Sequence, residues 1–186
     1  MLDKITFAKR YSKALFDLLK ANHQLDSGYQ ELVAVRDVLK LTPQLLTALD
    51  SVSFPEADKD KLVQSLVNNV SSSYVKNLIK VVFACGRMNN FVELVNQFEK
   101  LYDRDHKIVH ADLITAIDLS GQQKTALKSA FAKRIGANQV IFNYRVDRQI
   151  IGGVIIKSSN VIFDGSVKSR INRVRQLLLN WYDSIY

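Results

Sequence analysis

The chain has 186 residues, 47% of them hydrophobic and 24% charged, which is an ordinary balance for a soluble globular protein and excludes disorder over most of the length. No apolar stretch approaches the roughly 20 residues that a membrane-spanning helix needs. The net charge is +8, and the single cysteine, Cys85, excludes an internal disulfide and a cysteine-based metal site.

The first 107 residues are predicted to form helices only. Apolar residues recur three and four positions apart, as in amphipathic helices, and no segment alternates as a strand does. Residues 71–73 can cap a helix, Gly86 ends one, and Asn90 with Glu93 resembles a capping box. The expected helices lie near residues 4–20, 25–40, 43–49, 53–70, 71–86 and 90–107.

From about residue 108 the apolar period becomes alternating. Residues 109–119 and 140–146 are predicted to be half-buried strands. Between them, a helix begins at the capping box of Ser120 and Gln123 and ends at Gly136. The remaining expected elements are strands at 154–156 and 161–163, joined by residues 158–160, and a helix from Ser166 to Ile185.

The predicted fold is α+β with two domains: a six-helix bundle over residues 1–107 and a small α/β domain over residues 108–186. The first domain holds 15 basic and 13 acidic residues, a net charge of +2, and the second holds 11 and 5, a net charge of +6. The second domain is therefore expected to prefer an acidic partner, whether protein, nucleic acid or an anionic membrane surface.

The residues that carry chemistry in other proteins form no catalytic pattern here. His106 and His110 have the spacing of a helical metal pair, but they straddle the change from helix to strand and are expected to be solvated. Asp147 and Asp164 flank the short strands, and Asp164 is expected to bond N–H groups where the last helix begins instead of acting as an acid or base. Cys85 is expected to be a small buried hydrophobe. We expect no catalytic residue, no metal and no cofactor.

Two adjacent glycines, Gly152 and Gly153, could suggest a phosphate-binding loop. They precede a strand, whereas such a loop leads into a helix, and no Lys-Ser or Lys-Thr pair follows them. A tight bend is expected instead, with Gly152, Gly153 and Asp164 as structural turn residues.

Two surfaces are candidates for binding other proteins. The first helix has an apolar arc that is either fully buried or leaves a groove, beside the fifth helix, for a partner's amphipathic helix. The last helix carries basic residues that form either a solvated face or a docking surface for an acidic helix. No nucleic-acid-binding motif interleaves aromatic residues with these charges, which disfavours nucleic acid as a partner. The basic residues are Lys168, Arg170, Arg173 and Arg175.

Four segments match patterns of one known family, in order and spacing. Residues 8–16 (AKRYSKALF) match the pattern A-x-x-Y-A-x-A-L-F, and residues 77–87 match N-F-L-x-L-L…G-R. Residues 146–156 (VDRQIIGGVII) and 164–170 (DGSVKSR) together match D-P-x-L-I-G-G-x-x-I…D-x-S-V-x-x-R-L. The chain resembles the delta subunit of bacterial F-type ATP synthases, whose mitochondrial homologue is the oligomycin-sensitivity-conferring protein. Ser12, Arg148 and Ile171 replace the usual Ala, Pro and Leu.

The resemblance implies a non-catalytic subunit of the peripheral stalk. Such a stator joins the catalytic head to the membrane sector and resists rotor torque during ATP synthesis coupled to proton transport. It would lie at the cytoplasmic face of the cell membrane and touch the membrane only through the complex.

The resemblance also implies the partners. The N-terminal domain would bind the N-terminal segment of an alpha subunit, and the C-terminal domain would bind the C-terminal ends of the b subunits. The expected alpha-binding residues are Tyr11, Ala14, Leu15, Leu18, Leu78, Ile79 and Val82, and the expected b-binding residues are Lys168, Arg170, Arg173 and Arg175. The main alternative is a protein- or RNA-binding adaptor unrelated to ATP synthase. An enzyme is the third hypothesis, and it would need a deep polar pocket around Asp147 and Asp164.

Overall fold

The structure, a computed structural model, describes residues 4–51, 54–158 and 161–183, with side chains described for all of these except Asp50 and residues 181–183. The chain divides into two compact units, Met1–Tyr102 and Asp103–Tyr186. The first unit is helical and the second contains a small sheet, so the predicted α+β fold class is confirmed.

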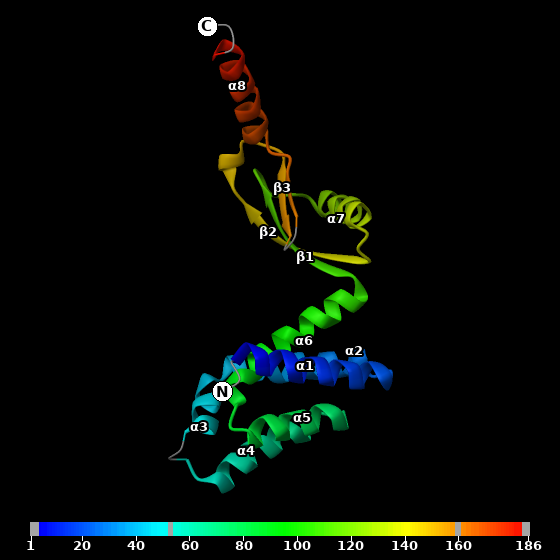
Figure 1. Cartoon of the computed structure of the whole chain (residues 1–186), viewed down its shortest axis with the longest axis vertical. Helices are drawn as coiled ribbons and strands as arrows, with labels where there is room; N and C mark the ends of the chain where they lie inside the picture. Colours follow the sequence, from blue (N-terminus) through cyan, green and yellow to red (C-terminus); the bar gives the residue numbers. More distant parts are fainter. Residues whose placement is uncertain (1–3, 52–53, 159–160, 184–186) are drawn as a thin grey trace. The chain divides into compact units, whose positions relative to one another are not determined.

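The described part of the first unit is built from helices joined by short turns (Figure 1). The predicted helices all form, with ends that shift by a few residues. The predicted opening of the fourth helix at Ser53 lies outside the described residues. The helices are α1 (Lys4–Ala21), α2 (Leu25–Leu41), α3 (Pro43–Asp50), α4 (Glu56–Asn68), α5 (Ser73–Ala84), the 3-10 turn η1 (Met88–Asn90) and α6 (Phe91–His106).

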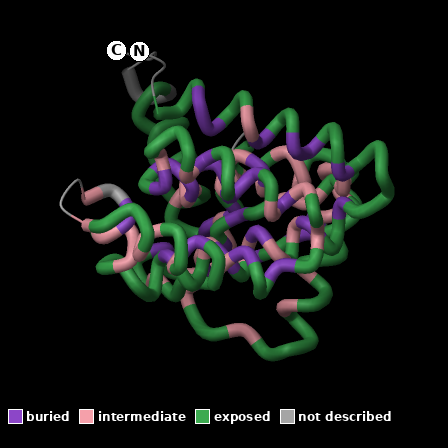
Figure 2. The backbone as a smooth tube through the Cα atoms, turned by 90° about the horizontal axis from the view of Figure 1, so that it is seen from below, coloured by how far each residue is buried: buried purple, intermediate pink, exposed green. Residues whose placement is uncertain are grey.

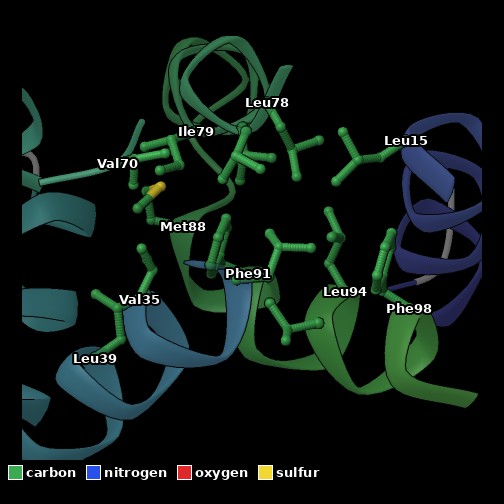
Figure 3. Packing of buried hydrophobic residues seen from close by; sticks show 14 of the residues in the cluster. Leu15, Val35, Leu39, Val70, Leu78, Ile79, Met88, Phe91, Leu94 and Phe98 are labelled. Atoms are coloured by element: carbon green, nitrogen blue, oxygen red, sulfur yellow. The ribbon is translucent and has the colours of Figure 1, made fainter. Parts of the chain in front are cut away.

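Helix α6 contributes fully buried side chains to the core of the first unit. Figure 3 shows Phe91 between side chains of α5 and α2, whereas Leu94 and Phe98 lie beside Leu15 of α1. Fully burying one such side chain contributes about 1.5–3 kcal/mol. Figure 2 shows the same pattern along the whole bundle, with buried positions recurring on the inner sides of the helices. The helical apolar period thus fixes which face of each helix turns inward.

A polar cluster joins α2 to α6 at the edge of this core. The Glu99 carboxylate accepts hydrogen bonds from the Tyr29 hydroxyl and from Arg36 Nη1, each at 2.9 Å. Burial alone would lower the pKa of Arg36, but the hydrogen bonds and charges of Asp37 and Glu99 outweigh it and raise the pKa above its ordinary value. The guanidinium therefore remains charged and holds the two helices in register.

The ends of α5 correct two expectations from the sequence. Ser72 occupies the N-cap position but makes no capping hydrogen bond with its side chain; the N–H groups of Ser71 and Ser72 donate instead to the Glu31 carboxylate of α2. Cys85 was expected to be buried and is exposed, because it is the C-cap residue of α5 and the chain turns away after it at Gly86.

The second unit is a four-stranded sheet of order β2-β1-β3-β4, with β1 and β2 parallel and the other neighbours antiparallel. Helix α7 packs against the sheet, and Phe131 reaches from it into a core with Leu113, Phe142 and Ile156. The elements are β1 (Ile108–Thr115), α7 (Gly121–Ile135), β2 (Gln139–Val146), the 3-10 turn η2 (Arg148–Ile150), β3 (Val154–Ser158), β4 (Ile162–Asp164) and α8 (Val167–Asp183).

The turn signals around α7 are confirmed. Ser120 and Gln123 form both hydrogen bonds of a capping box, and Gly136 closes the helix in the left-handed conformation at φ 68°. The first strand was predicted to reach residue 119, but β1 ends at Thr115. The Thr115 hydroxyl donates a hydrogen bond to the Ile117 carbonyl at 2.7 Å, and this bond begins a turn.

Candidate protein-binding sites

The Gly152–Gly153 segment is a turn that packs against the start of α8. Gly153 has φ +78°, and a Cβ added to it would lie 2.2 Å from the carbonyl oxygen of Gly165. Two hydrogen bonds close the turn: the Gly165 N–H donates to the Val154 carbonyl at 2.9 Å, and the Val167 N–H donates to the Gly152 carbonyl at 3.0 Å. The glycines therefore permit a close backbone approach that fixes where α8 leaves the sheet.

Asp164 holds the first turn of α8. Its carboxylate accepts hydrogen bonds from Ser169 Oγ at 2.6 Å and from the Ser166 N–H at 2.9 Å, and Ser166 Oγ accepts from the Ser169 N–H at 3.2 Å. The hydrogen bonds from Ser169 and Ser166 lower the pKa of Asp164 below its ordinary value, because they stabilise the charged carboxylate.

This arrangement predicts an acid-dependent loss of stability. Because the pKa of Asp164 is lower in the folded chain, its contribution is complete above its ordinary pKa of 3.8 and is lost as the pH falls below that value through the folded pKa. We expect Asp164→Asn to lower the midpoint of thermal unfolding near neutral pH, where the charged carboxylate contributes fully, and to flatten the pH dependence in the acid range, so that the variant and the parent chain converge at low pH. If the unfolding midpoint of the variant falls with acid as steeply as that of the parent chain, the carboxylate contributes nothing to the stability of the fold.

A hollow of about 520 Å³ lies between α1 and the end of α5. The rings of Phe7 and Tyr11 lie 4.3 Å apart, and the Arg87 guanidinium lies 4.9 Å from the centre of the Phe7 ring. The floor of the hollow is mostly apolar, whereas its two arginines give it a positive rim. It is lined by Phe7, Arg10, Tyr11, Ala14, Cys85 and Arg87.

The predicted alpha-binding residues fall into two groups. Tyr11 and Ala14 line the hollow, and Leu18 is 49% exposed further along α1. The other four are at most 7% exposed and belong to the core, so they can only support the helices that bear a surface. These four buried residues are Leu15, Leu78, Ile79 and Val82.

The four predicted basic residues all lie exposed on α8, as does every residue from 170 to 180. Among the described residues of α8, the apolar side chains are exposed as well; Ile171 and Val174 are each 54% exposed, and Leu178 is 62% exposed. These three residues line a hollow of about 430 Å³ together with Val167, Arg170 and Arg175.

The hollow in the first unit is also lined by residues that are not among the predicted alpha-binding residues. Phe7, Arg10 and Cys85 line the α1–α5 hollow, and only Arg87 could be singled out from the sequence, through the Gly-Arg pair that ends α5. On α8, the apolar residues have the spacing of an amphipathic helix, but this spacing does not show whether the apolar side is covered.

The remaining candidates for chemistry lie in separate local settings. His110 Nε2 lies 3.1 Å from Asp103 Oδ2, and the Asp147 carboxylate accepts a hydrogen bond from the Gln149 N–H at the start of η2. Within residues 4–51, 54–158 and 161–183, no group of three His, Cys, Asp or Glu side chains is arranged to hold a metal ion. Among the helices of the same ranges, none combines the length and apolar character needed to cross a membrane.

Comparison with known proteins identifies the family. The model of the ATP synthase delta (OSCP) subunit family matches residues 7–178. The chain is 43% identical over 179 residues to the ATP synthase subunit delta of Lactiplantibacillus plantarum, covering 96% of this chain and 98% of the relative. The corresponding protein of Limosilactobacillus reuteri is 45% identical over 178 residues, with the same coverage. The chain belongs to the ATP synthase delta (OSCP) subunit family.

Membership of the delta subunit family confirms the predicted role as a peripheral-stalk subunit of an F1Fo ATP synthase. It gives no support to an unrelated adaptor. A chain in the structure of the mitochondrial ATP synthase hexamer of Toxoplasma gondii, 22% identical, shares the fold with a TM-score of 0.68, covering 92% of this chain and 97% of that one. The fold therefore persists where the sequence has diverged.

Proposed function

We propose that the chain is a non-catalytic linker with one binding surface in each unit. The observation that carries this proposal is that each unit has an uncovered apolar surface edged by arginines: the α1–α5 hollow in the first and the α8 stripe in the second. A protein that transmits force between two others needs two such surfaces and needs no reactive group.

The α1–α5 hollow is the proposed site for the N-terminal segment of an alpha subunit. Tyr11, Ala14 and Leu18 are spaced three and four residues apart along α1, so they follow one side of the helix. An amphipathic helix laid beside them would bury its apolar side against the floor, and its acidic residues would meet Arg10 and Arg87.

Helix α8 is the proposed site for the C-terminal ends of the b subunits. The unit that contains it carries most of the positive charge, which favours an acidic partner and speeds its approach. With both surfaces occupied at the cytoplasmic face of the membrane, the chain resists rotation of the catalytic head because each end is held by a different part of the stator. The proposed mechanism therefore requires only that each unit of the chain binds its partner subunit tightly.

Substitution of Ala14 tests the first surface. Ala14 is exposed and lines the hollow, so Ala14→Asp should leave the fold intact but place a carboxylate against the apolar side of the bound helix. We expect the affinity of the full chain for a synthetic alpha N-terminal peptide to fall at least about tenfold, measured by calorimetric titration.

Ala57→Asp is the matched control, because Ala57 is an exposed alanine in the first turn of α4, outside the lining of the hollow. It should bind the peptide as the parent chain does. Equal affinities for all three proteins would place the alpha contact elsewhere. Leu15→Asp is unsuitable for this purpose, since Leu15 is 3% exposed and the change would unfold the bundle.

A further inference from the structure

Within the described residues, hydrogen bonds hold the start of helix α8 to its unit. The Val167 N–H donates to the Gly152 carbonyl, and Ser166 and Asp164 cap the helix start. From there α8 runs away from the sheet (Figure 1), and all its residues from 170 to 180 are exposed. An isolated helix of this length is marginally stable in water, so a second helix packed along α8 would stabilise it.

The apolar residues of α8 have the spacing of a coiled-coil seam. Val167, Ile171, Val174 and Leu178 are separated by four, three and four residues and line one hollow of about 430 Å³. In heptad lettering, Ile171 and Leu178 take position a, and Val167 and Val174 take position d. This repeat averages 3.5 residues, so the stripe remains facing a single partner helix when the two helices wind around each other in a left-handed supercoil.

Three of the four basic residues among 167–180 of α8 occupy positions that flank this seam. Lys168 and Arg175 take position e, and Arg170 takes position g. Arg170 and Arg175 line the same hollow as the apolar residues, one on each side. Arg173 takes position c, outside the flanks. Flanking e and g charges select the partner of a coiled coil by meeting opposite charges on it.

We propose that α8 forms a two-helix coiled-coil contact with a partner helix that has apolar residues in heptad register and acidic residues at its e and g positions. This inference rests on the proposed role of α8 as the stalk-binding surface and adds the register and charge of the partner. A second copy of the chain does not fit as the partner. In a parallel or an antiparallel pair of α8 helices, Lys168, Arg170 and Arg175 would face positive charges across the seam and repel them.

Two synthetic helical peptides of about 21 residues test the charge requirement, both with leucine at positions a and d. One carries Glu at positions e and g, and the other carries Lys. We expect the full chain to bind the Glu peptide about tenfold more tightly than the Lys peptide near 50 mM salt, and the difference to shrink near 500 mM salt. Equal binding of the two peptides, or dimerisation of the chain alone in sedimentation, would overturn the inference.

A pair of charge reversals tests the register. Arg175→Glu and Arg173→Glu change the net charge equally and lie two residues apart on the same exposed helix. Arg175→Glu should weaken binding of the Glu peptide about fivefold and strengthen binding of the Lys peptide, whereas Arg173→Glu should change either by less than about twofold. Equal effects of the two variants would mean that α8 attracts acids through net charge alone, which would overturn the register.

Binding of b subunits from solubilised native membranes separates this inference from the proposed function. If the parent chain captures b and loses it on Leu178→Asp, while the peptides are bound without charge preference, the stalk site stands and the coiled-coil assignment fails. If Leu178→Asp leaves capture of b unchanged, the proposed site on α8 itself fails. Capture that weakens with Leu178→Asp and with Arg175→Glu, but not with Arg173→Glu, supports both.

Discussion

Replacement of Gly153 by alanine should unfold the turn that anchors α8. At φ +78°, a residue with a side chain is strained, and here the added Cβ would also lie 2.2 Å from the Gly165 carbonyl oxygen, inside the contact distance of any carbon and oxygen. Backbone cannot rotate away as a flexible side chain can, so the hydrogen bonds that join the turn to α8 would break. We expect a loss of about 3 kcal/mol or more in the stability of the second unit.

Substitutions at two other glycines separate the effect of the positive φ from the effect of the close contact with Gly165. Gly136 has φ +68° with open space around its Cβ position, so Gly136→Ala should cost only the conformational penalty of about 1–2 kcal/mol. Gly121 begins α7, has no positive φ and has open space, so Gly121→Ala should be neutral or stabilise by about 0.5 kcal/mol.

Hydrogen exchange resolved by segment is the appropriate measurement, because it reports on residues 103–186 without interference from the helical unit. Faster exchange should appear in β3, β4 and the start of α8 for Gly153→Ala. If Gly153→Ala and Gly136→Ala destabilise the unit equally, the close approach to Gly165 contributes nothing and only the backbone conformation matters.

The helical fold was largely predictable because local rules and tertiary packing agree in it. The i, i+3, i+4 spacing of Phe91, Leu94 and Phe98 predicted the buried face of α6, and all three are fully buried. The capping box of Ser120 and Gln123 predicted the start of α7 for the same reason, since its hydrogen bonds lie within four consecutive residues.

Exposure was harder to predict, because it depends on what packs against a residue from elsewhere in the chain. Cys85 and Leu178 follow helical patterns typical of buried positions, yet both are exposed. Conversely, Leu15 and Ile79 were assigned to a binding surface by family resemblance, and the packing of the bundle buries them. A one-dimensional pattern gives the direction in which a side chain points, whereas the neighbours that cover it come only from the assembled fold.

Binding of the b subunits should depend on one face of α8, and two adjacent leucines can show this. Leu178 is 62% exposed and takes position a of the heptad, whereas Leu179 is 53% exposed and takes position b, outside the seam. An aspartate at either position has the same intrinsic effect on helix formation and the same charge. Any difference between Leu178→Asp and Leu179→Asp in binding therefore reports which side of α8 is covered in the complex.

We expect Leu178→Asp to reduce capture of a soluble b-subunit segment by about 100-fold, because the variant loses the burial of a leucine and forces a carboxylate into an apolar seam. Leu179→Asp should reduce it by less than about threefold. Surface plasmon resonance with the full-length chains measures both, and matching circular dichroism spectra exclude a folding defect. Equal losses in the two variants would mean that b contacts both sides of α8. No loss in either variant would mean that b contacts another part of the second unit.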